Sequence, residues 1–96
     1  MKTAYLDLIR HAIGLGFTVS VWDGEEWQVK KSTKIREIDD AVKSVEEAVL
    51  RFRDADNKIV GSAQVSSAYE FEPNETVIDH SDNEWMNAWS EKYENA

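Results

Sequence analysis

The chain has 96 residues, which is enough for one hydrophobic core and too few for two, so we expect a single domain spanning residues 1–96. The hydrophobic fraction of 42% is typical of a globular protein, and the absence of cysteine excludes disulfide bonds and thiolate zinc sites. No apolar run has the length of a membrane-spanning helix or a signal peptide, so we expect a cytoplasmic protein without membrane contact.

The net charge of −8 is concentrated in the last third of the chain. Residues 1–60 hold ten Lys and Arg against eleven Asp and Glu, whereas residues 61–96 hold only Lys92 against eight acidic residues. A negative surface disfavours direct contact with nucleic acid and favours a basic protein partner, such as the nucleic-acid groove of another protein. The alternative is that the charge only keeps a small protein soluble.

The first predicted element is a helix over residues 3–13. Its apolar residues recur at helical spacing, and Gly14 and Gly16 follow as stop signals. Residues 1–16 therefore read as a helix with its C-terminal cap.

A β-hairpin is predicted over residues 17–31, where apolar residues alternate on both sides of an Asp-Gly turn. A three-residue loop that starts at Asp23 would place Val21 opposite Trp27, on a continuously apolar face. Trp22 then lies on the other face of the hairpin, among polar neighbours.

The next segment, residues 34–47, has apolar residues at helical spacing and follows the pair Ser32-Thr33, which offers an N-cap. This helix would complete a first strand-strand-helix unit at residues 17–47.

A second hairpin is predicted directly after that helix. Its strands cover residues 48–53 and 59–65, with a turn rich in Asp and Asn between them. Closing the hairpin with a four-residue loop pairs large residues with small ones across the strands. The predicted pairs are Phe52 with Gly61 and Leu50 with Ala63.

Residues of about 66–82 read as a long loop because they contain several turn-forming clusters. A last helix begins after Ser81 or Asp82, and Ser81 with Glu84 has the spacing of a capping box. The apolar stripe of this helix contains Trp85, Met86, Trp89 and Tyr93.

These elements predict an α+β fold in the order α-ββα-ββα, with the second unit at residues 48–96. Two such units give a four-stranded, mainly antiparallel sheet with helices packed on one face. The other face would carry Trp22, Arg51 and Arg53, and it is either a contact surface or is covered by the last helix or the 66–82 loop.

The sequence contains no motif for catalysis. His80, flanked by Asp79 and Asp82, is the better of two candidate bases, and a small hydrolase or metal enzyme centred on it is one hypothesis. The alternative is that these residues form a helix N-terminus rich in capping groups and acids. We therefore expect no enzyme, no metal site and no cofactor.

Four tryptophans in a chain of this length are unusual. Trp27, Trp85 and Trp89 fall on apolar stripes and are expected in the core. Trp22 is the exception, and we expect it to belong to an interface, including that of a homodimer.

Three segments together resemble small acidic accessory proteins encoded by tailed bacteriophages. They are the hairpin VSVWDGEEWQVKKS, the segment VKSVEEAVLRFRD and the ending EWMNAW. The resemblance implies expression in a bacterial cytoplasm and a protein that binds, redirects or inhibits a host protein. It carries no assigned active residues.

The leading hypothesis is therefore a non-enzymatic protein-binding module that acts as an inhibitor through an acidic surface, with nucleic-acid mimicry as one version. The alternative is a structural protein that forms a homodimer through its sheet face. The predicted partner-binding residues are Trp22, Arg51, Arg53, Glu70, Glu72, Glu75, Asp79, Asp82 and Glu84.

Overall fold

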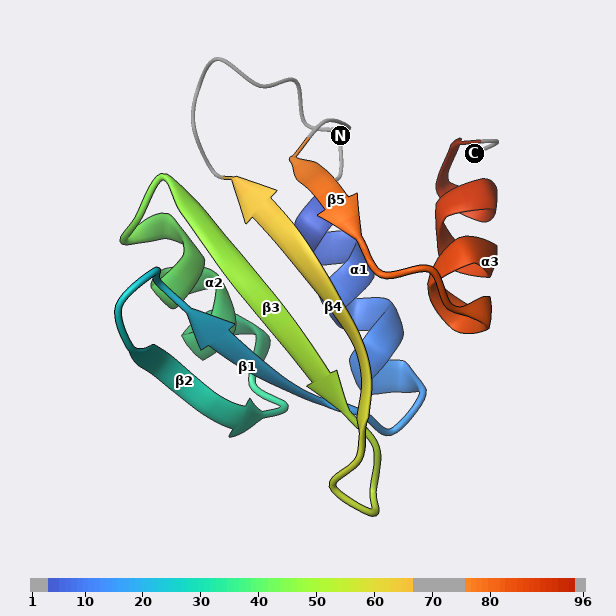
Figure 1. Ribbon diagram of the computed structural model, residues 1–96, viewed down its shortest axis with the longest axis horizontal. Coiled ribbons are helices and arrows are strands. Elements are labelled where there is room, and N and C mark those ends of the chain that lie inside the picture. Colours follow the sequence, from blue (N-terminus) through green and yellow to red (C-terminus); the bar gives the residue numbers. More distant parts are fainter. Residues whose placement is uncertain (1–3, 67–75, 95–96) are drawn as a thin grey trace.

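A computed structural model describes residues 4–66 and 76–94 and shows an α+β fold with three helices and one five-stranded sheet. Figure 1 shows the arrangement of these elements. In chain order they are α1 (Ala4–Gly14), β1 (Thr18–Trp22), β2 (Trp27–Ser32), α2 (Ile35–Lys43), β3 (Glu47–Arg53), β4 (Ile59–Ser66), β5 (Val77–His80) and α3 (Glu84–Glu94).

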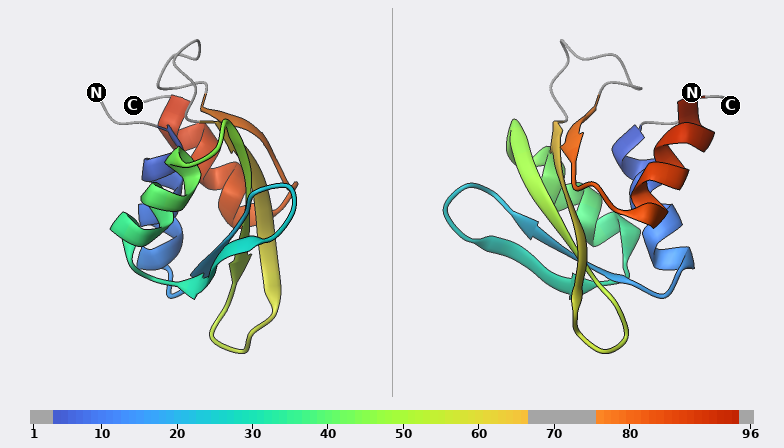
Figure 2. Two further views of the ribbon diagram at one scale, coloured as in Figure 1. Left: turned by 90° about the vertical axis from the view of Figure 1, so that its left-hand side faces the viewer. Right: turned by 45° about the vertical axis from the view of Figure 1, so that its right-hand side comes forward.

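The strands lie in the order β2-β1-β3-β4-β5, and every neighbouring pair is antiparallel. The helices lie on one side of the sheet, as the two views of Figure 2 show. The predicted α+β class and the one-sided packing are confirmed, while the prediction of four strands is wrong. The fifth strand, β5, comes from the end of the segment that the sequence analysis assigned to a loop.

The first hairpin has a different register from the predicted one. Its loop has four residues, so that Trp22 lies opposite Trp27 and Val21 lies opposite Val29. Two irregularities in β2 shift the pairing, and Lys31 in the second of them has a φ of 50°. Trp27 is therefore paired with Trp22 and half-buried, and its expected place in the core is wrong.

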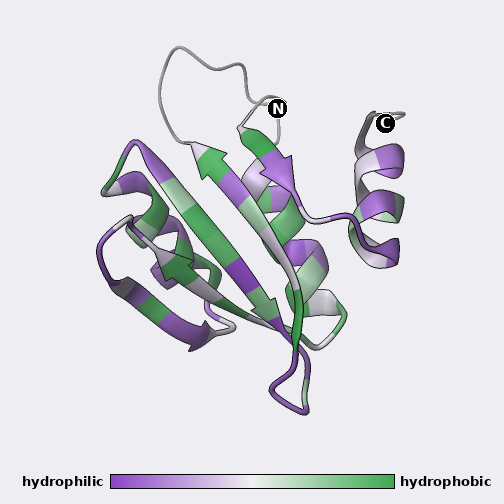
Figure 3. Cartoon of the chain, in the orientation of Figure 1, coloured by the Kyte–Doolittle hydropathy of each residue, from purple (hydrophilic) through white to green (hydrophobic). Residues whose placement is uncertain are grey.

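The second hairpin has the predicted register. Phe52 lies opposite Gly61 and Leu50 opposite Ala63, with a shift in pairing only beside the loop. The large side chains face the helices, and Phe52 and Leu50 are both completely buried. Figure 3 shows hydrophobic stretches interrupted by hydrophilic bands along β3 and β4.

The second helix, α2, is shorter than the predicted 34–47 and ends at Lys43. Lys34 occupies its N-cap position, and the Ser32 hydroxyl accepts a hydrogen bond from the Lys34 backbone N–H at 3.0 Å. The predicted capping pair, Ser32-Thr33, thus lies just before the N-cap position. Ser32 still stabilises the turn into the helix through this hydrogen bond.

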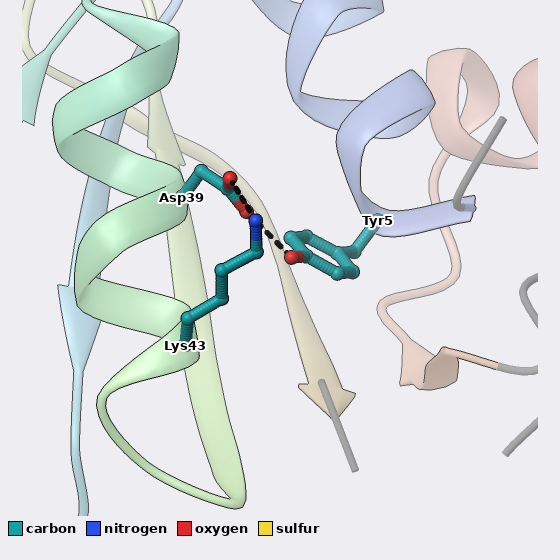
Figure 4. A network of polar contacts seen from close by, with 3 residues as sticks. All are labelled: Tyr5, Asp39 and Lys43. Carbon is teal, nitrogen blue, oxygen red and sulfur yellow. Dashed lines mark hydrogen bonds and ion pairs between the residues drawn. The ribbon is translucent and has the colours of Figure 1, made fainter. Parts of the chain in front are cut away.

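Helices α1 and α2 are joined by a polar network that lies beside the core (Figure 4). The Tyr5 hydroxyl donates to Asp39 Oδ1 at 2.5 Å, and Lys43 Nζ lies 2.8 Å from Asp39 Oδ2. Burial raises the pKa of Tyr5, and the hydrogen bond and charge of Asp39 raise it further. Asp39 also raises the pKa of Lys43. The network fixes the position of α1 relative to α2.

Helix α3 is attached through its tryptophans. Trp85 Nε1 donates to the Val60 carbonyl at 2.9 Å, and the indole packs edge-on against Phe17 and Phe52. Trp89 Nε1 donates to Asp7 Oδ2 on α1 at 2.8 Å. Trp85 and Trp89 are therefore packing residues, as predicted, although Trp85 is only partly buried.

The connection from β5 to α3 differs from the predicted capping box. The Ser81 hydroxyl accepts from the Ser62 backbone N–H at 3.1 Å and donates to Asn83 Oδ1 at 2.6 Å. The first helical backbone bond runs from Asn87 N–H to the Asn83 carbonyl. Ser81 therefore ties the connection to β4, and His80 ends a strand instead of starting a helix.

Candidate protein-binding face

The candidate site is the open face of the sheet, which we define as the side turned away from the helices. Along β3, Ala48, Leu50 and Phe52 are buried against the helices, so the alternate residues point to the open face. Helix α3, one of the two predicted covers, packs beside α1 and leaves this face open. The other predicted cover, the loop, lies mostly outside the described residues.

A row of side chains crosses the open face from one edge of the sheet to the other. Each member lies directly opposite the next on neighbouring antiparallel strands, so their Cα atoms are about 5 Å apart from strand to strand. The row begins at an aromatic end on β2 and finishes at an acidic end on β5. Its members are Trp27, Trp22, Val49, Gln64 and Asp79.

At the aromatic end of the row, Trp22 and Trp27 form a compact cluster with Arg51, which lies two residues after Val49 on β3. We call these three residues the Trp-Arg cluster. The two indole rings meet edge to face with centroids 5.1 Å apart, and Arg51 Cζ lies 4.8 Å from the centroid of Trp27. All three residues are half-buried. Such a geometry combines aromatic pairing with a cation–π contact and restricts the rotamers of each side chain.

The loop next to the Trp-Arg cluster is held by one carboxylate. Asp23 accepts hydrogen bonds from the backbone N–H groups of Glu25 and Glu26, both at 2.8 Å, and from the Gln28 side chain. These hydrogen bonds hold the pKa of the Asp23 carboxyl below its usual range. The backbone N–H of Glu26 has the largest effect, then that of Glu25, and the Gln28 side chain has a smaller one. This arrangement sets the four-residue loop and hence brings Trp27 opposite Trp22.

A shallow depression of about 240 Å³ lies toward the acidic end of the row. His80 is one of the residues that line it. The ring Nδ1 of His80 lies 2.9 Å from the Ser81 carbonyl oxygen, which can only accept, so Nδ1 is the donor of this hydrogen bond. The His80 backbone N–H donates to the carboxylate of Asp79. The lining residues are Val49, Ser62, Ala63, Gln64, Asp79, His80 and Ser81.

The predicted site residues divide into three groups. Trp22, Arg51 and Arg53 lie on the open face as expected, and Asp79 joins them at the other end of the row. Asp82 and Glu84 are exposed at the connection from β5 to α3 and lie apart from the Trp-Arg cluster. The remaining predicted residues lie outside the described residues; they are Glu70, Glu72 and Glu75.

Trp27 and Gln64 are the two members of the row that sequence reasoning missed. The signal for Trp27 was Asp23. An aspartate side chain at the start of a loop can accept hydrogen bonds from the backbone N–H groups two and three residues later, and this favours a four-residue loop over a three-residue one. The longer loop places Trp27 opposite Trp22. Gln64 follows from the register of the second hairpin, since it lies directly opposite Val49.

Within residues 4–66 and 76–94, no three His, Asp or Glu side chains are grouped so that they could hold a metal ion. Within the same part of the chain, no helix has the length and apolar character needed to cross a membrane. Comparison with protein families, curated proteins and solved structures found no match to this chain.

Proposed function

We propose that this protein is a non-enzymatic protein-binding module and that the open face of its sheet is the contact surface. The observation that carries the proposal is the Trp-Arg cluster, in which two half-buried tryptophans and an arginine stand together on a face away from the helices. Tryptophan and arginine are the residues most enriched among those that dominate binding energy at protein interfaces.

The acidic residues give the proposed contact its second component. Asp79 lies on the open face, and Asp82 and Glu84 are exposed beside it in the chain. A basic region on the partner would gain charge complementarity there, chiefly through a faster association rate and at low salt. The bacteriophage resemblance makes a bacterial host protein the proposed partner, with inhibition as the proposed outcome.

Quantitative capture from a bacterial lysate tests this proposal. Trp22→Ala removes the centre of the Trp-Arg cluster, and we expect it to weaken binding of the captured protein by more than tenfold, as for a hot-spot residue. Leu15→Ala is the matched control, because Leu15 is an exposed apolar residue (48% exposed) in the turn after α1. Equal binding by wild type and by folded Trp22→Ala would refute the proposal.

A homodimer is the second candidate, and the charge pattern of the face favours it. Arg51 and Arg53 lie on the central strand β3 and Asp79 lies on the edge strand β5. A two-fold axis between these two strands would place the arginines of one copy against the aspartate of the other. Light scattering at low and at high salt tests this candidate. A dimer that Trp22→Glu converts into a folded monomer would support it, and a monomer under both conditions would remove it.

A further inference from the structure

Arg51 is the residue of the open face whose chemistry is incomplete. Its side chain is half-buried, yet no residue described in the structure accepts a hydrogen bond from it or forms an ion pair with it. The residues directly across from it on the neighbouring strands are Ser20 and Ser62, which are small and uncharged. An acidic residue at such a cross-strand position would stabilise the sheet by pairing with the arginine, and neither neighbour supplies one.

The neighbouring groups restrict how this arginine can be used. Trp27 covers one side of the guanidinium at 4.8 Å, and the Ser20 hydroxyl already accepts the Lys31 backbone N–H at 2.9 Å. A guanidinium has five N–H donors and no acceptor, so the group that completes this site must accept hydrogen bonds. A carboxylate fits best, because its two oxygens match the arginine fork and carry the opposite charge.

The surroundings of Arg51 define what must accompany the carboxylate. Trp22 meets Trp27 edge to face and lies directly opposite Val49, which gives an apolar surface beside the guanidinium. Asp79 stands at the far end of the same row, about 10 Å from Val49 by two strand spacings. A polyanion that followed the row would meet this acid in a protein of net charge −8. The site therefore favours one carboxylate beside an apolar group over a nucleic acid.

Resting on the proposed function, we propose that the protein partner places an aspartate or glutamate carboxylate on Arg51 and an adjacent apolar side chain against Trp22 and Val49. Arg51 is thus the charge-reading residue of the contact, and the tryptophans supply the apolar anchor. The partner's contact surface is acidic where it meets the Trp-Arg cluster, although the protein itself is acidic elsewhere.

Small probes test this inference without knowledge of the partner. The full chain, labelled with nitrogen-15, is titrated with 3-phenylpropionate and with its neutral counterpart, 3-phenylpropionamide, while the indole N–H signals of Trp22 and Trp27 and the Nε–H signal of Arg51 are followed. A fragment of this size is expected to bind with a dissociation constant of about 1–10 mM. We expect the acid to bind about tenfold more tightly than the amide, as for a charge-assisted hydrogen bond.

Two variants separate Arg51 from general positive charge. Arg51→Gln should abolish the preference for the acid, whereas Arg53→Gln should retain it. Arg53 lies two residues along on the same strand and face, and its Nη1 already donates to the Asn57 carbonyl at 3.0 Å. Equal affinity for acid and amide, an acid preference that persists in Arg51→Gln, or no saturable shift up to about 50 mM would overturn the inference.

A third titration distinguishes the other class of ligand. Saturable binding of the oligonucleotide dT10 at the same indole signals, tighter than the acid and weakened by salt, would overturn the inference in favour of nucleic acid. The results also separate this inference from the proposed function. If the amide binds at Trp22 as tightly as the acid, the carboxylate on Arg51 is refuted and the open face remains a contact surface. If Trp22→Ala captures the lysate protein as well as wild type does, the proposed function itself is refuted.

Discussion

Gly61 is expected to be essential to the packing of α3, and Gly61→Ala tests this. A Cβ at this position would lie 3.1 Å from Trp85 Cζ2, 3.3 Å from Ser81 Oγ and 3.4 Å from Asn83 Oδ1. These distances are tighter than ordinary van der Waals contact. The indole has little room to retreat, because Val60 holds its nitrogen and two phenylalanine rings pack on it.

The sign of the effect follows from two opposing terms. Overpacking a well-filled site costs about 1–3 kcal/mol, while replacing a strand glycine by alanine stabilises by about 0.4–1 kcal/mol through the unfolded chain. We therefore expect Gly61→Ala to lower the free energy of unfolding by about 1 kcal/mol. Gly14→Ala is the control, since a Cβ there meets nothing within 4 Å, and it should be neutral or stabilising.

Urea unfolding followed by far-UV circular dichroism measures the change, with the midpoint expected to fall and the slope to stay constant. A double-mutant cycle then identifies the cause. In a Trp85→Leu background the indole, which is the nearest of the three groups, is gone. Gly61→Ala should then cost less or become neutral, with a coupling of about 1–2 kcal/mol between the sites. A Gly61→Ala protein as stable as wild type, or the same destabilisation in both backgrounds, would refute the packing argument.

Two other changes test the polar network and the bulged strand. Tyr5 has a pKa raised above its ordinary value near 10, so the stability that its proton confers is complete below pH 10 and is lost as pH rises through the folded-state pKa. Tyr5→Phe should therefore lower the free energy of unfolding by about 1–2 kcal/mol at pH 7, where Asp39 still has its ion pair with Lys43. In urea titrations, its stability should fall less steeply than that of wild type between about pH 10 and pH 11. A parallel fall in both proteins would count against this reasoning. Lys31 has a φ of 50°, so Lys31→Gly should be neutral or stabilising by up to about 1 kcal/mol in thermal unfolding, whereas a clear loss of stability would show that its side chain matters more than its backbone.

The second hairpin shows how far pattern alone can set a register. Large residues at Leu50 and Phe52 of β3 each need a small partner on β4, so the pairs Phe52 with Gly61 and Leu50 with Ala63 were predictable. The first hairpin has an equally clear pattern but the wrong predicted register. There the loop length is set by hydrogen bonds of the Asp23 side chain, and two irregularities in β2 change which face each residue occupies. Neither feature has a periodic signal.

The candidate site was predictable in part for the same reason. Trp22 and Arg51 alternate with buried residues on central strands, and this placed both on the open face. Trp27 depended on the loop and was assigned to the core. Strand β5 was missed because it has four residues and only Val77 and Ile78 are apolar, so its extended form depends on hydrogen bonding to β4. Tertiary pairing, which no local pattern contains, decides such a short strand.

The contacts between α1 and the last part of the chain have a consequence for synthesis on the ribosome. Tyr5 N–H donates to Thr76 Oγ1 across 71 residues, and Asp7 accepts from Trp89 across 82. These bonds form only after nearly the whole chain has emerged, and until then β4 is an unpaired sheet edge open to other nascent chains. A protein truncated after residue 66 should therefore aggregate. During translation, the C-terminal third is made last, and its strand β5 covers the edge of β4 and so prevents that edge from pairing with other chains.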